Sequence, residues 1–302
     1  MPDFPVTALR SVDMTVPDLA AAEQFYTNVW GLDVAVRTRD AIYLHGTGSD
    51  HHILALHGGE TAALRSITFR AATPASLGDI AMRAVQAGAR LLQPVGPVDW
   101  EGGGNGLVLS EPNGCILRIV HGDAERVAQP LERDRPTRLS HVNINSTQTD
   151  ATAAFFDAAL GLRLSDRSKL MAFVRCNSDH HCIVIADAPV NTLNHTAFLM
   201  PDLEGVMRGS GRMVDHGYPI AWGVGRHGPG DNVFAYFVDP FGVVIEYAAE
   251  VLQVDDSYRV RGPLEWTWPP GRTDHWGIAP PKTEALKHAQ LAVPFASARA
   301  AL

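Results

Sequence analysis

The stretch Phe25-Tyr-Thr-Asn-Val-Trp-Gly-Leu-Asp-Val34 returns about 130 residues later as Phe155-Phe-Asp-Ala-Ala-Leu-Gly-Leu-Arg-Leu164. Two further pairs of stretches recur in the same order and at nearly the same offset: Asp50-His-His-Ile-Leu-Ala55 with Asp179-His-His-Cys-Ile-Val184, and Glu111-Pro-Asn-Gly-Cys-Ile-Leu117 with Asp239-Pro-Phe-Gly-Val-Val-Ile245. One such match could arise by chance. Three matches in order at almost one offset indicate a duplicated domain.

Each half divides again into two modules, in which a strand is followed by a helix and then by three strands. In the first module the apolar spacing predicts a helix that Asp18 caps and Gly31 ends. Its strands are predicted at Ser11–Val16, Asp33–Arg37, Ala41–His45 and His52–Leu56. The second module begins near Leu64 and has its helix near Leu77–Ala87, and the third and fourth modules begin near Leu139 and Leu193.

Four short βαβββ modules cannot each bury a core, but paired modules can curl their strands into an open, cup-like barrel with helices outside. The predicted class is therefore α+β with two tandem domains. We expect an N-terminal domain over residues 1–122, a linker over 123–137, a C-terminal catalytic domain over 138–250 and a tail over 251–302 packed on the core. A helix near Lys282–Leu291 is predicted in this tail. Three tryptophans of the tail are expected to anchor the tail on the core: Trp266, Trp268 and Trp276. The alternative is that they close the cavity.

The bulk composition excludes several classes of function. The chain has 302 residues, a net charge of −8 and an apolar fraction of 46%. An acidic chain argues against nucleic-acid binding, and no apolar run is long enough to predict a membrane span. The N-terminus is acidic, contains proline and does not resemble a signal peptide. Three cysteines, Cys115, Cys176 and Cys182, form no disulfide framework and favour a reducing, cytoplasmic compartment. Packed thiols are favoured over a zinc site.

Three residues suggest a metal site in the second half. His141, His195 and Glu246 each fall on a short apolar stretch that predicts a strand. Two neutral imidazoles and one carboxylate on one side of a metal leave other positions open, which suits a non-heme Fe(II) that must bind a substrate and dioxygen. A lone histidine in a strand is more often a hydrogen-bonded core residue.

The duplication supplies an internal control for this interpretation. The first half keeps the scaffold, but its counterparts of the three residues are Ser11, a position near Ser66, and Arg118. A purely structural role would be expected to recur in both halves. Restriction to one half therefore favours a site over a scaffold role.

The sequence from Gly225 to Glu246 closely resembles the signature of type I extradiol ring-cleavage dioxygenases of the vicinal oxygen chelate superfamily, which have the glyoxalase-like fold. That signature has a histidine (His227), a short gap, an apolar residue and a tyrosine (Tyr236), then Asp-Pro-x-Gly and the ligand glutamate. The chain departs from it at Ala235, where the family usually has a larger apolar residue. The resemblance covers roughly residues 8–250.

The resemblance implies that His141, His195 and Glu246 hold Fe(II), or less often Mn(II). It places the acid–base histidine in the pair His180-His181, with spacing in favour of His181 and His180 left possible. His227 and Tyr236 are then expected to hydrogen-bond the substrate. The implied reaction inserts O₂ into a substituted catechol beside its hydroxyls and gives a muconic semialdehyde-type product. Oligomers are common in this family, so a homo-oligomer is also implied; the absence of a membrane or nucleic-acid partner is expected from the composition.

Three alternatives stay open. A metal-free small-molecule binding protein of the same superfamily would keep the cup and lose the ligands. A hydroquinone- or hydroxyphenylpyruvate-type dioxygenase would keep the same three ligands, and a glyoxalase-type isomerase would draw on more carboxylates. The pair His51-His52 recurs in the half where no site is expected, so a His-His pair alone is weak evidence. The substrate is not specified: Phe173, Val174, Trp222 and the tail are expected to line the cavity, and Arg226 is considered for an anionic substituent but favoured as a solvated residue.

Overall fold

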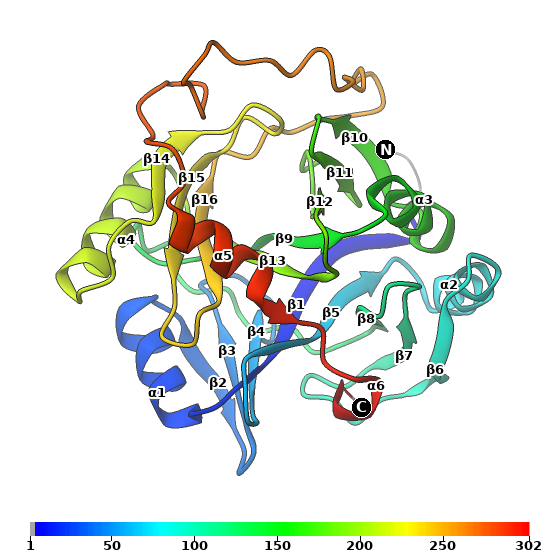
Figure 1. Cartoon of the computed structure of the whole chain (residues 1–302). Helices are drawn as coiled ribbons and strands as arrows, with labels where there is room; N and C mark the ends of the chain where they lie inside the picture. Colours follow the sequence, from blue (N-terminus) through cyan, green and yellow to red (C-terminus); the bar gives the residue numbers. More distant parts are fainter. Residues whose placement is uncertain (1–3, 302) are drawn as a thin grey trace.

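The computed structural model describes residues 4–301 and contains four modules in which a helix follows the first of four strands (Figure 1). The predicted α+β class with paired βαβββ modules is confirmed. The N-terminal half contains β1 (Val6–Val16), α1 (Leu19–Gln24), the π-helical turn η1 (Phe25–Val29), β2 (Asp33–Arg37), β3 (Ala41–His45), β4 (Leu54–Gly58), β5 (Ala63–Ala71), α2 (Pro74–Gln86), β6 (Arg90–Pro97), β7 (Asn105–Ser110) and β8 (Ile116–His121). The C-terminal half contains β9 (Arg138–Ser146), α3 (Thr149–Leu160), β10 (Arg163–Arg167), β11 (Met171–Arg175), β12 (Ile183–Asp187), β13 (Thr192–Leu199), α4 (Leu203–Asp215), β14 (Trp222–Arg226), β15 (Val233–Val238) and β16 (Val244–Ala249).

The two sheets have the same topology. Their strand orders are β2-β3-β4-β1-β5-β8-β7-β6 and β10-β11-β12-β9-β13-β16-β15-β14. In each sheet the first strands of two modules meet as an antiparallel pair, β1 with β5 and β9 with β13. Each of these first strands also lies parallel to the last strand of its own module, as β13 does to β16. The order is linear, so each sheet is an open cup rather than a closed barrel.

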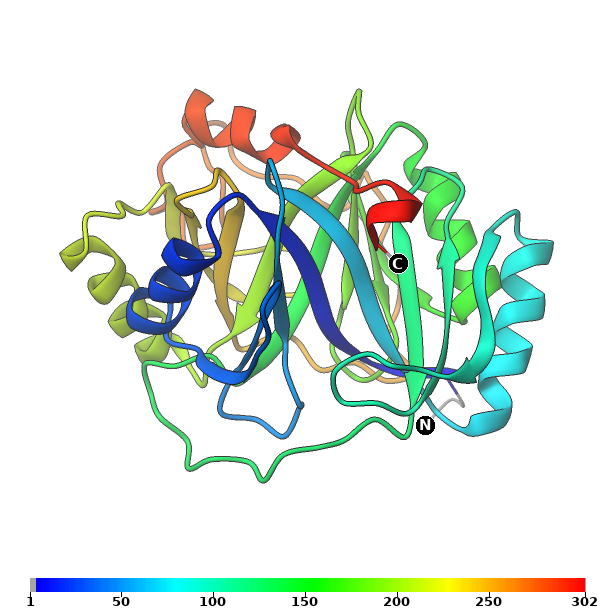
Figure 2. The same ribbon diagram turned by 90° about the horizontal axis from the view of Figure 1, so that it is seen from below.

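Helices cover the outside of both cups and join the two halves (Figure 2). Arg212 in α4 donates to the carbonyl oxygens of Val29 and Trp30, at 2.7 and 3.1 Å. On the other flank, Arg83 in α2 donates to the carbonyl oxygen of Ala158 in α3 at 2.8 Å. Charged donors thus satisfy the carbonyls that helix C-termini leave unpaired, and they tie each helix to a helix of the other half.

Several element ends differ from the prediction for local reasons. The cap at Asp18 is confirmed, since its Oδ1 accepts from the Ala21 amide at 3.0 Å. Helix α2 begins at Pro74, three residues before the predicted start, because Thr73 Oγ1 accepts from the Ser76 amide and proline suits the first helical position. Strand β1 begins at Val6 rather than Ser11, since its first residues pair with β5.

The tail lies on the C-terminal sheet. Its elements are α5 (Glu284–Ala292), β17 (Val293–Pro294) and α6 (Ala298–Ala301). Helix α5 crosses in front of β13 in Figure 1, and β17 then pairs with that strand. The predicted tail helix is shifted by two residues at its start because Thr283 caps it, with Oγ1 accepting from the Leu286 amide. Among residues 4–301, no helix combines the length and apolarity that crossing a membrane would need.

Candidate metal centre

Three neighbouring strands, β9, β13 and β16, carry His141, His195 and Glu246. Ala197 in β13 pairs with His141 on one side and with Glu246 on the other. Paired residues of neighbouring strands face the same way, and so do residues two apart on one strand. His195, two residues before Ala197, therefore shares the face of the other two, and the small Ala197 side chain leaves room between them.

The ligand atoms of this trio converge. His141 Nε2 lies 3.1 Å from His195 Nε2 and 3.3 Å from Glu246 Oε2, and His195 Nε2 lies 3.0 Å from Glu246 Oε2. All three side chains are buried. Among residues 4–301 it is the one such group of three or more His, Cys, Asp or Glu residues. The three cysteines lie elsewhere as buried free thiols, as predicted.

The chemistry of these atoms fits a cation. His195 Nδ1 lies 2.9 Å from Asn194 Oδ1, which can only accept, so Nδ1 carries the proton and Nε2 presents a lone pair. Glu246 Oε2 is buried and receives no hydrogen bond from any residue of the described range. Lone pairs facing one another in a buried site repel unless a cation lies between them. The trio therefore fits a divalent metal better than a structural role.

Burial sets the protonation of the trio. Burial lowers the pKa of His195 to about 4, so its imidazole is neutral at pH 7. Burial alone would raise the pKa of Glu246, but protons and positive charge on the facing rings of His141 and His195 would outweigh this and hold it well below its usual value. A metal cation between the three side chains would supply the same charge with both rings neutral. Two neutral imidazoles and one carboxylate are the protonation states that metal ligation requires.

A hydrogen-bonded network outside the trio orients His195. Asn194 Oδ1 also accepts from Gln290 Nε2 in α5 at 2.9 Å, and Asn194 Nδ2 donates to Asn145 Oδ1 at 2.8 Å. Strand alternation would send the side chains of Asn194 and His195 to opposite faces. The β13–β9 register shifts between Leu193 and His195, and such a bulge re-aims a side chain. Sequence reasoning missed Asn194 and Gln290, because nothing in a strand or tail pattern indicates a bulge or a tail contact.

Replacing Asn194 with alanine tests this network. Residues that hold a ligating histidine contribute about 10- to 100-fold in metal affinity or activity. We expect Asn194→Ala to weaken metal binding by about that factor, measured by competition with a chelator. The control is Asn191→Ala, which removes an amide three residues earlier that accepts from Thr147 outside the site. Equal affinities in the two variants would contradict a role for Asn194.

His181 lies on the cavity wall and His180 lies behind it. The ring centroids of His181 and His141 are 4.5 Å apart. His181 Nδ1 lies 3.0 Å from His180 Nδ1, and His180 Nε2 lies 2.8 Å from Asp166 Oδ2. If His180 donates to the carboxylate, its Nδ1 accepts from His181, which leaves Nε2 of His181 as a base. Burial holds the pKa of His181 well below 6.5, which keeps the ring neutral.

A glycine lets the chain pass close to this base. Gly230 has φ +81°, and a Cβ atom there would lie 2.7 Å from Cε1 of His181. On another side, the ring centroid of Phe173 is 5.4 Å from that of His181. The His181 ring is thus confined, and any larger residue at position 230 would displace it.

His227 and Tyr236 form the opposite part of the wall. His227 Nε2 lies 3.0 Å from the Tyr236 hydroxyl. Tyr236 in β15 pairs with Glu246 in β16, which brings it beside the trio. Burial lowers the pKa of His227 to about 3, and burial together with Glu246 raises the pKa of Tyr236 well above 10. Both groups are therefore neutral, and if the imidazole N–H donates to the Tyr236 oxygen, the hydroxyl proton is free to donate to a ligand oxygen.

These residues share one cavity of about 370 Å³. It is lined by His141, Asn143, Ser168, Lys169, Leu170, Met171, Phe173, His181, Val184, His195, Trp222, His227, Gly228, Pro229, Asn232, Tyr236, Trp266, Trp268, Thr273, Lys282 and Gln290. The prediction that Phe173 and Trp222 line the cavity is confirmed. The prediction for Val174 is wrong, because the neighbour of Phe173 in β11 faces the other side of the sheet and packs in the core.

The tail supplies part of this wall. Trp266 and Trp268 line the cavity, whereas Trp276 stacks on the Arg226 guanidinium, 4.9 Å from its ring centroid. The tryptophans therefore both close the cavity and anchor the tail. Arg226 is used outside the cavity, where it pairs with Glu250 and donates to the carbonyl oxygen of Asp231. Sequence reasoning did not identify Lys282, the charged tail residue inside the cavity.

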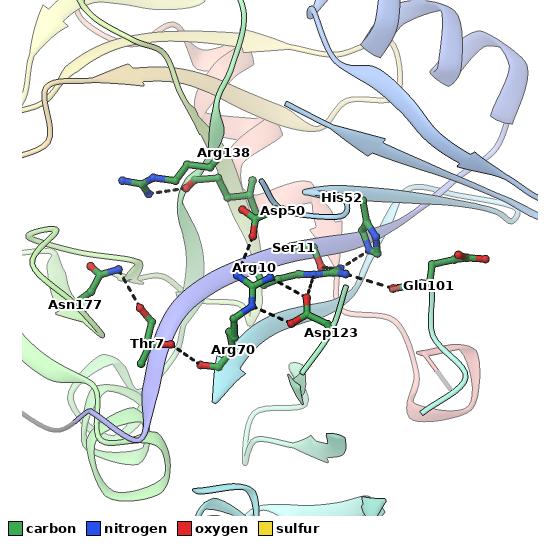
Figure 3. Close-up of polar contacts among 11 residues, drawn as sticks. Thr7, Arg10, Ser11, Asp50, His52, Arg70, Glu101, Asp123, Arg138 and Asn177 are labelled. Carbon is green, nitrogen blue, oxygen red and sulfur yellow. Dashed lines mark hydrogen bonds and ion pairs between the residues drawn. The ribbon is translucent and has the colours of Figure 1, made fainter. Parts of the chain in front are cut away.

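The N-terminal half shows what replaces a metal. The strand registers pair Ser11 and Arg118 with the same residue of β5, as predicted for the counterparts of His141 and Glu246. Arg118 Nη1 lies 2.7 Å from Asp13 Oδ2. Arg10 donates to Ser11 and contacts His52 (Figure 3). In the N-terminal cup, guanidinium groups thus provide positive charge. The three ligand side chains of the C-terminal cup include no such group.

Comparisons with known proteins agree with this geometry. A family model described as the Glyoxalase/Bleomycin resistance protein/Dioxygenase superfamily matches residues 8–117 and 138–247. The chain is 29% identical to Metapyrocatechase 2 of Cupriavidus necator over 88% of this chain and 87% of that protein. It is 24% identical to the manganese-dependent 2,3-dihydroxybiphenyl 1,2-dioxygenase of Geobacillus genomosp. 3, over 84% and 88%.

Solved structures show the same architecture. The Mn(II)-bound glyoxalase from Novosphingobium aromaticivorans superposes with a TM-score of 0.89 at 31% identity, over 98% of this chain and 99% of that one. An extradiol ring-cleaving dioxygenase from B. fuscum superposes with a TM-score of 0.82 at 21% identity, over 94% and 82%, and shares the fold. The predicted resemblance is confirmed, and the chain belongs to the Glyoxalase/Bleomycin resistance protein/Dioxygenase superfamily.

Proposed function

We propose that the protein is an extradiol dioxygenase that inserts O₂ into a substituted catechol beside its two hydroxyls. His141, His195 and Glu246 would hold the metal in this proposal. The observation that carries it is that three converging ligand atoms, a neutral histidine (His181) and a hydrogen-bonded His–Tyr pair meet at one cavity. The names of the relatives, metapyrocatechase and dihydroxybiphenyl dioxygenase, support the same reaction class.

For the metal we propose Fe(II), with Mn(II) as the alternative. Two imidazoles and one carboxylate with open positions are typical of non-heme Fe(II) oxygenases. One relative is named as manganese-dependent and one structural neighbour holds Mn(II). When bound, either ion supplies Lewis acidity and the electron transfer through which O₂ reacts with a catecholate.

The side chains around the metal position would handle protons and orientation. His181, with Nε2 free to accept, would take the proton of one catechol hydroxyl and later return it to the opening ring. His227 and Tyr236 would act together on a substrate oxygen: the imidazole N–H would donate to the Tyr236 oxygen, and the hydroxyl would donate to the substrate oxygen as negative charge develops there. The tryptophans of the tail would exclude water from the cavity.

Asp166→Asn tests the orientation of the base. Asp166 is buried and accepts from Tyr258 and from the Arg261 amide as well as facing His180. An asparagine amide retains the shape of the carboxylate but can present an N–H to His180. His180 would then accept from residue 166 and donate to His181, which reverses the direction of both hydrogen bonds. We expect kcat to fall by about one order of magnitude, part of the 10²–10⁴-fold that a positioned base contributes. The control is Asp187→Asn, on the exposed end of β12. If Asp166→Asn keeps both the metal content and the kcat of the wild type, the proposed orientation of His181 is contradicted.

The deciding experiment is anaerobic reconstitution with Fe(II) or Mn(II), followed by a panel of catechols. We expect O₂ uptake matched mole for mole by the yellow ring-opened product, because both oxygen atoms enter it. A metal-free binding protein would bind catechols and consume no O₂. A glyoxalase-type isomerase, the reaction named for one structural neighbour, would convert its substrate without O₂. Turnover without O₂ uptake would overturn the proposal.

A further inference from the structure

Lys282 brings a positive charge from the tail into the cavity. It precedes α5, and its Nζ lies 4.4 Å from the ring centroid of Trp222 and 5.7 Å from that of Tyr236. Its ammonium donates to Gln290 Oε1 at 3.1 Å. Because Gln290 donates to Asn194, which orients His195, the lysine is fixed in position relative to the metal ligands.

Lys282 forms no ion pair with an Asp or Glu among residues 4–301. The cavity wall as described contains no Asp or Glu, and its other lysine, Lys169, is an exposed residue. Glu246 attracts Lys282, but its own oxygens face the trio. Burial lowers the pKa of Lys282 to about 8, so the ammonium remains protonated at neutral pH.

An ammonium has three donors, and among residues 4–301 Gln290 supplies the one hydrogen-bond acceptor for them. The aromatic faces of Trp222 and Tyr236 attract the cation, but this only partly offsets the hydration that a buried ammonium loses. A negatively charged ligand group would complete the shell of this cation. The diol oxygens already have partners in the metal position and in the pair His227 and Tyr236. The ammonium lies closer to the Trp222 ring than to the Tyr236 ring, so it is placed to meet a further charged group of the same ligand, such as a ring substituent.

We propose that Lys282 is the anion-recognition residue of the cavity and that the preferred substrate is a catechol bearing a carboxylate substituent. This inference rests on the proposed dioxygenase function. It assigns to the tail a role in specificity, beyond covering the sheet. It also assigns to Lys282 the role that the sequence considered for Arg226, whose charge is neutralised by Glu250.

The test compares charged and neutral substrates of the same shape. The probes are 2,3- and 3,4-dihydroxybenzoate and the two corresponding dihydroxybenzamides, used with the metal-loaded protein. We expect the wild type to favour a carboxylate over its amide in kcat/KM. Truncating one partner of a buried charge pair typically costs 2–5 kcal/mol, so Lys282→Met is expected to lower this ratio by at least about 30-fold. Methionine keeps the apolar stem over Trp222, and Lys282→Arg is expected to retain the preference.

The matched control is Lys287→Met in α5, the helix that follows Lys282, where the ammonium is exposed and pairs with Glu284. It is expected to keep the wild-type ratio. Anaerobic titration followed by tryptophan fluorescence gives the affinities for acid and amide independently of turnover. Equal losses for both substrates in Lys282→Met, or no preference for the acid in wild type, would overturn the inference. If wild type binds the acids through Lys282 but cleaves no catechol, the proposed function fails and the anion site stands.

Discussion

Replacing Glu246 with glutamine is expected to abolish metal retention and to lower ring-cleavage turnover by at least about 10³-fold. The carboxylate is the single charged ligand of the trio, and its Oε2 lies 3.0 Å from His195 Nε2. A neutral amide is a much weaker ligand, and a metal-assisted reaction loses several kcal/mol without its metal, at about 1.4 kcal/mol for each factor of ten. Metal content by elemental analysis and O₂ uptake with a catechol are the two measurements.

The same substitution separates a metal site from a structural cluster. In the metal-free protein, Oε2 of Glu246 faces the nitrogens of His141 and His195 and has no hydrogen-bond donor among residues 4–301, which destabilises the folded state. A glutamine amide can donate to one of those nitrogens. The thermal midpoint of Glu246→Gln in a chelator is therefore expected to equal or exceed that of metal-free wild type. A midpoint several degrees lower would mean that the trio holds the fold rather than a metal.

The control for this experiment is Glu250→Gln, four residues further along the chain. Glu250 is an exposed partner of Arg226 and takes no part in the cavity. Exposed ion pairs contribute about 0–1 kcal/mol, so metal content and turnover are expected to stay at wild-type values. Loss of metal in both variants would point to general damage of β16 rather than to a ligand role for Glu246.

His181→Ala is expected to lower kcat by about 10²–10⁴-fold while the metal stays bound. His181 is the buried neutral imidazole nearest to His141 on the cavity wall, and burial keeps its pKa well below 6.5. It can therefore accept a proton at pH 6 as well as at pH 8. Its removal leaves the trio intact, so kcat is predicted to fall while metal content stays at the wild-type value. In Glu246→Gln, both are predicted to fall.

The duplication provides the control for His181. In the N-terminal half, His51 and His52 show the same contact, with their Nδ1 atoms 3.0 Å apart. Within residues 4–301 no group of metal-ligating side chains accompanies that pair, so His51→Ala is expected to leave kcat near its wild-type value. A His181→Ala enzyme that retains full turnover would remove His181 from the mechanism. Loss of metal together with turnover would reassign it to support of the ligands.

The fold and most of the site residues were predictable from the sequence because their signals are local or periodic. The repeat that begins at Phe25 and Phe155 predicted the paired modules, and the spacing of strands predicted which face a residue occupies. His141 and Glu246 meet because both pair with Ala197, a register that follows once the four modules are aligned. The counterparts in the first half, Ser11 and Arg118, then indicated which half carries the chemistry.

Tertiary structure alone decided the rest. The bulge at Asn194 turns a side chain that strand alternation would send to the opposite face, and only the paired strand reveals it. The tail lies outside the repeat, so no internal comparison predicts its path. Gln290 reaches the cavity through its contact with Asn194 in β13, 96 positions earlier in the chain, and Lys282 is held there by Gln290. Local sequence determines which elements form, whereas contacts between distant residues depend on the path of the whole chain. The charge that a substrate meets in the cavity depends on those contacts.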